Sequence, residues 1–262
     1  MAEIAAVYAV PHTPSFVDEV RLNGERSQTA QFFSTIRSHL EDAKPDVIVT
    51  INNDHFNTFF FDNWPTLAIG IGDRTAGPID QTPGMPWYDL AIEASAARHI
   101  LRSLVEEGFD LTFSVDLELD HGALVPLHFM TPTMALPIVP IFVNCVVPPL
   151  PSARRCYAFG RAVAGAIQSW ASAARVAVIT SGSLSLEIGG PRVEVNKTFG
   201  VPDHQSANNL VHRVAASCRA RLPGTGQSIR DHDVDNIDHV ANIGRRIDGR
   251  GRRDPVLHVS RF

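Results

Sequence analysis

Three of the 11 histidines stand where a strand-like stretch of sequence runs into a polar loop. His12 follows the apolar run IAAVYAV, His55 follows DVIVTI, and His121 lies in the segment LELDHGALVPLHF. A neutral imidazole is both a common metal ligand and the usual proton donor or acceptor near neutral pH. Two histidines plus one carboxylate, with further positions left open, is the ligand set of non-heme Fe(II) oxygenases. Each histidine alone is typical of a hydrogen-bonded structural residue, whereas the three together predict a metal or acid–base site.

Aromatic residues surround the second of these histidines. Phe56 follows His55 directly, and Phe59, Phe60 and Phe61 come next in the same loop. An aromatic wall of this kind suits a flat, apolar substrate and keeps water away from reactive intermediates. Packing in the hydrophobic core is the alternative interpretation, because large apolar side chains are most often buried for that reason.

Short β-rich runs alternate with longer helical patterns before residue 181. Strands are expected at residues 4–10, 46–51, 66–72, 136–146 and 176–180, and helices at 27–43, 87–108 and 154–174. Such alternation predicts an α/β fold, a single domain with a mixed or mostly parallel central sheet flanked by helices. Because sites in these folds collect at the carboxyl ends of strands, we expect His12 and His55 to converge there. We predict a loop at 117–129, which brings His121 to the same pocket.

The composition narrows the classes of function. The chain has 262 residues and a formal net charge of −5, so it has no basic excess for binding nucleic acid. No stretch of sequence approaches the roughly 20 apolar residues of a membrane span, and the N-terminus lacks the pattern of a secretory signal. The three cysteines are widely spaced and form neither a zinc pattern nor a disulfide framework. We therefore expect a cytoplasmic protein with neither nucleic-acid nor membrane partners.

The sequence changes in character near residue 205. Residues 205–262 contain ten arginines, no lysine and one aromatic residue, the terminal Phe262. Such a segment offers little apolar surface to bury, which is typical of solvated or disordered extensions. We therefore predict a catalytic domain at residues 1–204 and an atypical Arg-rich segment at 205–262, which is disordered or has replaced the normal end of the domain.

Five motifs occur in an order and at a spacing that resemble the class III extradiol ring-cleavage dioxygenases. They are PHTPS, NNDHFNTFFFDNWPTLAIGIG, LDHGALVPLHF, PIVPIFVNCVVPPLP and SGSLSLEIGGPR. The resemblance runs from about residue 1 to residue 204, and the Asp-His-Phe-Asn and Asp-His-Gly blocks together are its most specific part. It implies O2-dependent cleavage of a catechol-type ring next to its two hydroxyl groups.

The resemblance also implies a role for each histidine. His12 and His55 match the two iron-ligating histidines of the family, and His121 matches an acid/base histidine that does not bind the metal. The implied cofactor is Fe(2+), and the implied partners are a small aromatic diol and O2. We also expect a homo-oligomer, with a separate partner subunit as a further option. The motifs do not indicate which residues bind the substrate.

The chain departs from the family pattern at two places. Many members have a proton-transfer histidine where this chain has Leu186, so His121 must act without it or Glu187 must assist. The family's third iron ligand is a glutamate near the C-terminus, but no glutamate follows Glu194 here. Asp203 or an aspartate of the Arg-rich segment is the substitute that the sequence offers. The Arg-rich, Lys-free composition also fits an out-of-frame reading of a GC-rich gene.

Two other functions are compatible with these residues. A relative with an incomplete metal site would act as a non-catalytic structural or regulatory subunit, and the missing glutamate and Leu186 favour it. A Zn(II)-dependent hydrolase would use the same histidines, but the sequence shows no dedicated water-activating carboxylate beside them. Metal content combined with O2 uptake on a panel of catechols distinguishes all three functions.

Deleting residues 206–262 should change the melting temperature and the iron content little. A segment that buries little apolar surface cannot offset an ordering entropy of roughly 1–2 kcal/mol per residue. Thermal unfolding and metal analysis of the truncated and full-length chains measure the effect. If truncation unfolds the protein, or removes iron that the full chain retains, the segment is a structural element and carries the leading candidates for the third ligand.

Overall fold

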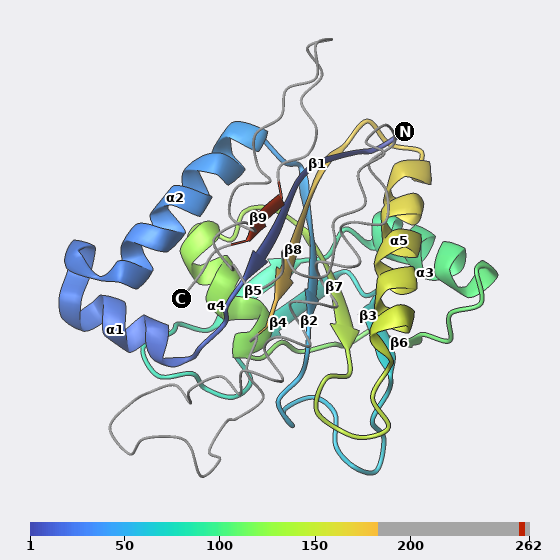
Figure 1. Cartoon of the computed structure of the whole chain (residues 1–262), viewed down its shortest axis with the longest axis horizontal. Helices are drawn as coiled ribbons and strands as arrows, with labels where there is room; N and C mark the ends of the chain where they lie inside the picture. Colours follow the sequence, from blue (N-terminus) through green and yellow to red (C-terminus); the bar gives the residue numbers. More distant parts are fainter. Residues whose placement is uncertain (183–256, 260–262) are drawn as a thin grey trace, which may run out of the picture. The chain divides into compact units, whose positions relative to one another are not determined.

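The computed structural model describes residues 1–182 and 257–259 (Figure 1). Its elements are β1 (Glu3–Val10), α1 (Ser15–Asn23), the 3-10 helix η1 (Gly24–Arg26), α2 (Gln28–Ala43), β2 (Val47–Asn52), β3 (Leu67–Gly70), β4 (Arg74–Gly77), β5 (Tyr88–Ala91), α3 (Ala94–Glu106), β6 (Thr112–Ser114), α4 (His121–Met130), β7 (Ile138–Val143), α5 (Ala153–Ser169), β8 (Arg175–Ser181) and β9 (Leu257–Val259). Of the predicted Arg-rich segment at 205–262, only β9 lies within the described residues. The domain boundary at residue 204 and the disorder of the segment therefore stay predictions.

Six strands of the N-terminal part lie in one sheet in the order β6-β3-β7-β2-β8-β1. Strand β2 pairs in parallel with β7 on one side and with β8 on the other, and β8 pairs in parallel with β1. Strand β3 runs parallel to β6 but antiparallel to β7. The prediction of an α/β fold with a mixed or mostly parallel sheet flanked by helices is therefore confirmed.

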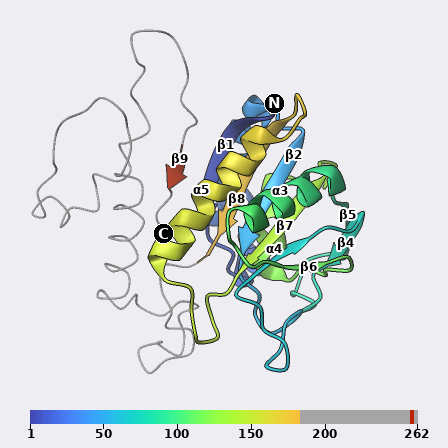
Figure 2. The same ribbon diagram turned by 90° about the vertical axis from the view of Figure 1, so that its right-hand side faces the viewer.

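Both faces of the sheet are buried, because alternate side chains of each strand point into two different cores. In β2, Val47 and Val49 belong to one core and Ile48 to the other. Helices α3 and α5 complete the first core, and α1, α2 and α4 complete the second (Figures 1 and 2). Burial on both faces explains why the strand sequences are continuous apolar runs rather than alternating ones.

The parallel strands bring the ends of distant segments together at one edge of the sheet. Val10, the last residue of β1, is in register with Ser181, the last residue of β8. Ile51, near the end of β2, is in register with Thr180. The loops that follow β1 and β2 and the end of β8 therefore meet at this edge, as expected for a parallel sheet.

The prediction of one helix over residues 87–108 is wrong at its start. Residues 88–91 form strand β5, which pairs antiparallel with β4, and helix α3 begins only at Ala94. Pairing with β4 satisfies the backbone of these residues, and this tertiary contact outweighs their local helical pattern. The hairpin formed by β4 and β5 is separate from the central sheet.

The prediction of a loop over residues 117–129 is also wrong, because His121–Met130 is helix α4. Asp120 caps this helix by accepting the backbone N–H of Gly122 at 2.8 Å. Nine of the ten residues of α4 are buried, so the segment lacks the amphipathic period by which a helix is recognised in sequence. Pro126, normally a helix breaker, lies inside it. None of the described helices is long and apolar enough to span a bilayer.

Leu124→Ala should lower the free energy of unfolding by about 2–5 kcal/mol, the usual cost of a cavity at a buried leucine. Leu124 is 0% exposed and lies on α4, in the core next to the sheet edge where the loops meet. Denaturant unfolding followed by circular dichroism measures the change.

Leu22→Ala is the matched control, because Leu22 on α1 is 72% exposed. This variant should differ from the unsubstituted protein by no more than about 0.5 kcal/mol. Equal losses in the two variants would contradict the position of α4 in the core.

Candidate metal centre

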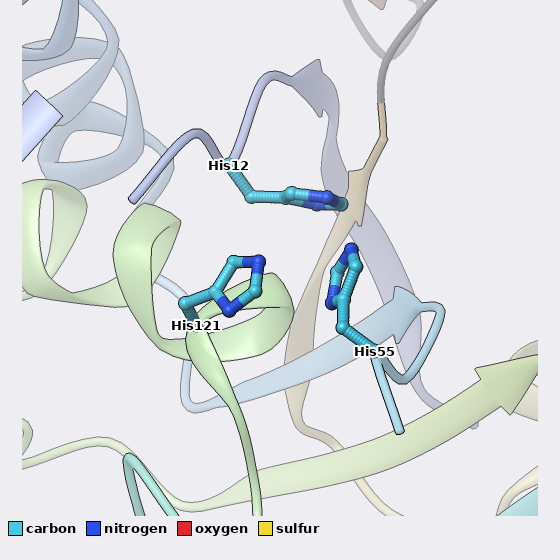
Figure 3. Close-up of side chains that lie close together, drawn as sticks. All are labelled: His12, His55 and His121. Atoms are coloured by element: carbon cyan, nitrogen blue, oxygen red, sulfur yellow. The ribbon is translucent and has the colours of Figure 1, made fainter. Parts of the chain in front are cut away.

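The side chains of His12, His55 and His121 face one shared space (Figure 3). The rings of His55 and His121 are stacked with centroids 4.1 Å apart, and the ring of His12 lies 5.0 Å from His55 and 5.7 Å from His121. His12 follows β1, His55 follows β2, and His121 is the first residue of α4. The predicted convergence of His12 and His55 is confirmed, and His121 lies beside them. Their individual chemical roles stay predictions.

His12 is oriented by the last residue of β8. Its Nδ1 lies 3.0 Å from the hydroxyl oxygen of Ser181, and that hydroxyl also contacts the carbonyl oxygen of Gly122. A carbonyl can only accept, so the single proton of the Ser181 hydroxyl goes to Gly122. The hydroxyl oxygen then accepts from His12, which places the proton of His12 on Nδ1 and leaves its Nε2 with a free lone pair.

The carbonyl of Gly122 is available to Ser181 because of Pro126. In an α-helix this carbonyl would accept from the backbone N–H four residues later, and proline has no N–H. Pro126 occupies that position in α4. The proline that interrupts the helical hydrogen bonding therefore exposes the acceptor that orients His12 through Ser181.

His55 is oriented by Asp120. Its Nδ1 lies 2.8 Å from the carboxylate, and its backbone N–H donates to the same oxygen at 2.9 Å. The carboxylate can only accept, so Nδ1 carries the proton and Nε2 the lone pair. Nε2 lies 3.0 Å from the amide nitrogen of Asn53, which donates to it. A metal ion bound at Nε2 would take the place of this hydrogen bond.

Asp120 is buried and ionised. Burial alone would raise its pKa, but the hydrogen bond from His55 and the electrostatic attraction of that ring, together with His121 and Asn57, hold the pKa below its ordinary value. A carboxylate that orients a metal-binding imidazole in this way is a regular partner in metal sites. The Asp-His-Gly motif indicated this region. It did not indicate the contact between Asp120 and His55, because the two residues are 65 positions apart.

His121 is oriented by Asp80, a residue that no sequence motif indicated. The carboxylate oxygen of Asp80 lies 2.5 Å from Nδ1 of His121. Burial would raise the pKa of Asp80, but the hydrogen bond and the charge of His121 outweigh it and hold the pKa below its ordinary value. All three imidazoles thus present Nδ1 to an oxygen atom and keep Nε2 for the shared space.

The three histidines fit a metal ion. Among the described residues, one ring nitrogen from each lies within 4.8 Å of the other two. Nitrogens bound to one ion through bonds of about 2 Å are at most about 4 Å apart, so the group is close to the dimensions of a metal site. Burial, with the neighbouring His55 and His121, lowers the pKa of His12 to about 3. His12 is therefore neutral, as a metal-binding imidazole must be.

The loop after β2 is fixed by the buried carboxylate of Asp54. It accepts the backbone N–H groups of residues 57–59 at 3.0–3.2 Å. Phe56 has a φ of 61°, in the left-handed region that residues other than glycine rarely adopt. Asp54 therefore holds the backbone beside His55 in a conformation that is unfavourable by itself, a common feature of functional sites.

The four phenylalanines of this loop do not form one wall. Phe59 packs against the hydrophobic core, whereas Phe60 is exposed and Phe61 is 80% exposed. The ring of Phe56 packs on Trp64 with centroids 4.6 Å apart. Core packing thus accounts for Phe59, and Phe56, next to His55, remains the candidate for contact with a flat substrate.

A small cavity lies beneath the loop and does not fit an aromatic substrate. It is lined by Asp54, Phe59, Asp120 and Phe142 among others, and its volume is about 20 Å³. That space holds roughly one water molecule.

The residues at which the chain departs from the family pattern lie outside the described residues. These are Leu186, Glu187, Glu194 and Asp203. The structure therefore tests neither the assistance of Glu187 nor the substitution of Asp203 for the missing glutamate. The metal-binding group of the described part consists of nitrogen donors only.

A family model described as the catalytic LigB subunit of aromatic ring-opening dioxygenase matches residues 6–223. The matched range includes all three histidines of the site. The chain belongs to this family. Membership of the LigB family agrees with the resemblance to extradiol dioxygenases in the motifs that carry His12, His55 and His121.

Curated relatives carry the name 2,3-dihydroxyphenylpropionate/2,3-dihydroxicinnamic acid 1,2-dioxygenase. The protein of Photorhabdus laumondii is 30% identical over 175 residues, which cover 66% of this chain and 53% of that protein. The protein of Mycobacterium sp. (strain MCS) is 32% identical over 194 residues, which cover 71% of this chain and 56% of that protein. The chain thus spans little more than half the length of these relatives.

Ser181→Ala should weaken metal binding by about 10–100-fold, the usual effect of removing a group that orients a metal-binding imidazole. Without the hydroxyl, His12 is free to carry its proton on either nitrogen, and its ring loses its orientation. Anaerobic titration calorimetry with Fe(II) measures the dissociation constant.

Thr180→Val is the matched control, because Thr180 precedes Ser181 on β8 and its hydroxyl bonds only to the carbonyl of Tyr8 at 3.2 Å among the described contacts. This variant should keep the original affinity. If the two variants bind Fe(II) equally well, Ser181 does not orient His12.

Proposed function

We propose that the protein is a non-heme Fe(II)-dependent extradiol dioxygenase, which cleaves the aromatic ring of a catechol-type substrate with O2. The observation that carries the proposal is the convergence of three imidazoles, each with Nδ1 held by an oxygen and Nε2 turned to one space. Membership of the LigB family and the names of the relatives support this reaction. Those names also suggest a catechol with a three-carbon acid side chain as the first substrate to try.

His12 and His55 are the metal ligands in this proposal, and each binds through Nε2. Ser181 and Asp120 accept from the two Nδ1–H groups, which leaves both lone pairs on Nε2; at His55 the metal would replace the hydrogen bond from Asn53. Fe(II) bound there would supply binding positions for the diol and for O2, together with the redox chemistry. The protein's part is to hold both imidazoles in a fixed orientation, each with its lone pair on Nε2.

His121 takes the proton of a substrate hydroxyl in this proposal. Its Nε2 lies in the same space as those of the two ligands, and its Nδ1–H donates to Asp80. Its stacked position on His55 keeps it close to a diol that is bound to the metal. With leucine in place of the family's second histidine, His121 is the group assigned to this proton transfer.

The alternative is a catalytically impaired or non-catalytic relative that acts as a structural or regulatory subunit. Two features of the sequence favour it, the absence of any glutamate between Glu194 and residue 262 and the presence of Leu186 in place of the family's second histidine. A site with two histidines and no carboxylate would hold Fe(II) more weakly. A cytoplasmic location and a homo-oligomeric state, with a partner subunit as a further option, complete the proposal.

Reconstitution with Fe(II) followed by O2 uptake on a panel of catechols tests the proposal. We expect one equivalent of iron per chain and diol-dependent O2 consumption. His12→Ala and His55→Ala should each lose iron and activity together, because each removes a ligand. His121→Ala should keep its iron while turnover falls by about 10²–10⁴-fold, the usual contribution of a positioned acid or base.

His39→Ala is the control, because His39 is exposed on α2, away from the three clustered histidines. It should keep both iron and activity. Stoichiometric iron without O2 uptake on any diol would favour the non-catalytic subunit, and hydrolysis supported by Zn(II) would favour a hydrolase. Loss of iron in His121→Ala would make His121 a ligand instead of a proton acceptor.

A further inference from the structure

Asp80 lies in the connection between β4 and β5 and reaches the site from outside the family motifs. Its two carboxylate oxygens have different partners. Oδ2 lies 2.5 Å from Nδ1 of His121, and Oδ1 accepts the hydroxyl of the buried Thr82 at 3.0 Å. Both side chains of the His121–Asp80 pair are largely buried, so water competes little for this hydrogen bond.

The contact determines which nitrogen of His121 carries the proton. A carboxylate has no proton to donate, so Nδ1 must carry the proton in this hydrogen bond and Nε2 must carry the lone pair. Without the carboxylate, a neutral imidazole can carry its proton on either nitrogen. Protonation at Nε2 would leave no lone pair facing the shared space.

The hairpin that carries Asp80 is held in place without this carboxylate. Backbone hydrogen bonds join Ile79 to Leu119 at 2.9 Å and Leu119 to Ala76 at 2.8 Å. The hydroxyl of Thr75 bonds the carbonyl of Leu117. Since these contacts fix the hairpin, a purely structural role does not explain the placement of Asp80 against His121.

We propose that Asp80 is a positioning residue, which holds His121 in the tautomer with the proton on Nδ1 and so keeps Nε2 ready to accept a proton from the substrate. The catalytic part of this inference rests on the proposed dioxygenase function. In the step it supports, the O–H bond of a substrate hydroxyl breaks and an N–H bond forms at Nε2. The resulting imidazolium lies against the Asp80 carboxylate, which stabilises its charge, and no further reactant is required.

Nitrogen-15 NMR of the metal-free, full-length protein with labelled histidine tests the tautomer directly. The spectra are recorded at mildly alkaline pH, and the signals of His121 are assigned as those missing from His121→Ala. The unsubstituted protein should show a protonated Nδ1 and an unprotonated Nε2. In Asp80→Ala these signals should move to the averaged positions of two exchanging tautomers.

Kinetics of the iron-loaded enzyme test the consequence. Asp80→Ala should lower kcat by about 10–100-fold, with KM and iron content unchanged. Asp80→Asn, which keeps an acceptor of the same shape but no charge, should lie between Asp80→Ala and the unsubstituted enzyme. It also serves as the folded comparison if Asp80→Ala is unstable.

Asp89→Ala is the matched control, because Asp89 lies on the same hairpin, is exposed and pairs with Arg74 at the surface. It should change neither the NMR signals of His121 nor kcat. An unchanged His121 tautomer in Asp80→Ala would overturn the inference, and so would equal losses of kcat in Asp80→Ala and Asp89→Ala. If no diol is turned over by the unsubstituted protein, the dioxygenase proposal fails, while the NMR result still decides whether Asp80 sets the tautomer.

Discussion

The carboxylate of Asp120 is the contact on which the rest of the site depends. It accepts the backbone N–H of Gly122 and so starts helix α4, and it accepts both the ring and the backbone N–H of His55. The side-chain amide of Asn57 donates to it as well. One buried charge therefore sets the place of His121 at the first residue of the helix and the orientation of His55. Such a carboxylate is stable in the interior because its partners satisfy it, since an unpaired buried charge would be strongly destabilising.

The three imidazoles share one requirement, that Nδ1 be occupied so that Nε2 is free, and the fold meets it in three different ways. Ser181 supplies a hydroxyl that is itself committed to a helical carbonyl, and Asp120 and Asp80 supply carboxylates. The Ser181 hydroxyl can donate to the carbonyl of Gly122 because Pro126 has no N–H, so this carbonyl of α4 has no helical hydrogen-bond donor. The uncharged partner, Ser181, holds His12. Burial lowers the pKa of His12 to about 3. The charged partners belong to His55 and His121.

The sequence predicted those features of the fold and the site that depend on the local pattern of residues. Apolar runs predicted the strands, and their polar ends predicted that His12 and His55 would converge, since parallel strands end at one edge of a sheet. The prediction from sequence failed where contacts between distant segments determine the structure. Asp80 lies 41 positions from His121, and Ser181 lies 59 positions from Gly122, so no spacing within a motif indicates either contact. Helix α4 was missed because it is apolar on all sides, and β5 because its pairing with β4 outweighs its own propensity.

The carboxylates that lie nearest to the three histidines are already engaged, which bears on the missing third ligand. Asp120 accepts four hydrogen bonds, Asp80 is shared between His121 and Thr82, and Asp54 holds three backbone N–H groups. A metal ion bound to any of these three would compete with the hydrogen bonds that hold an imidazole or the loop. Within the described residues, the group that lies close enough to share one ion is His12, His55 and His121, so His121 is the candidate there for a third protein ligand. If His121 instead remains a proton acceptor, as Asp80 favours, a carboxylate ligand would have to lie outside the described residues.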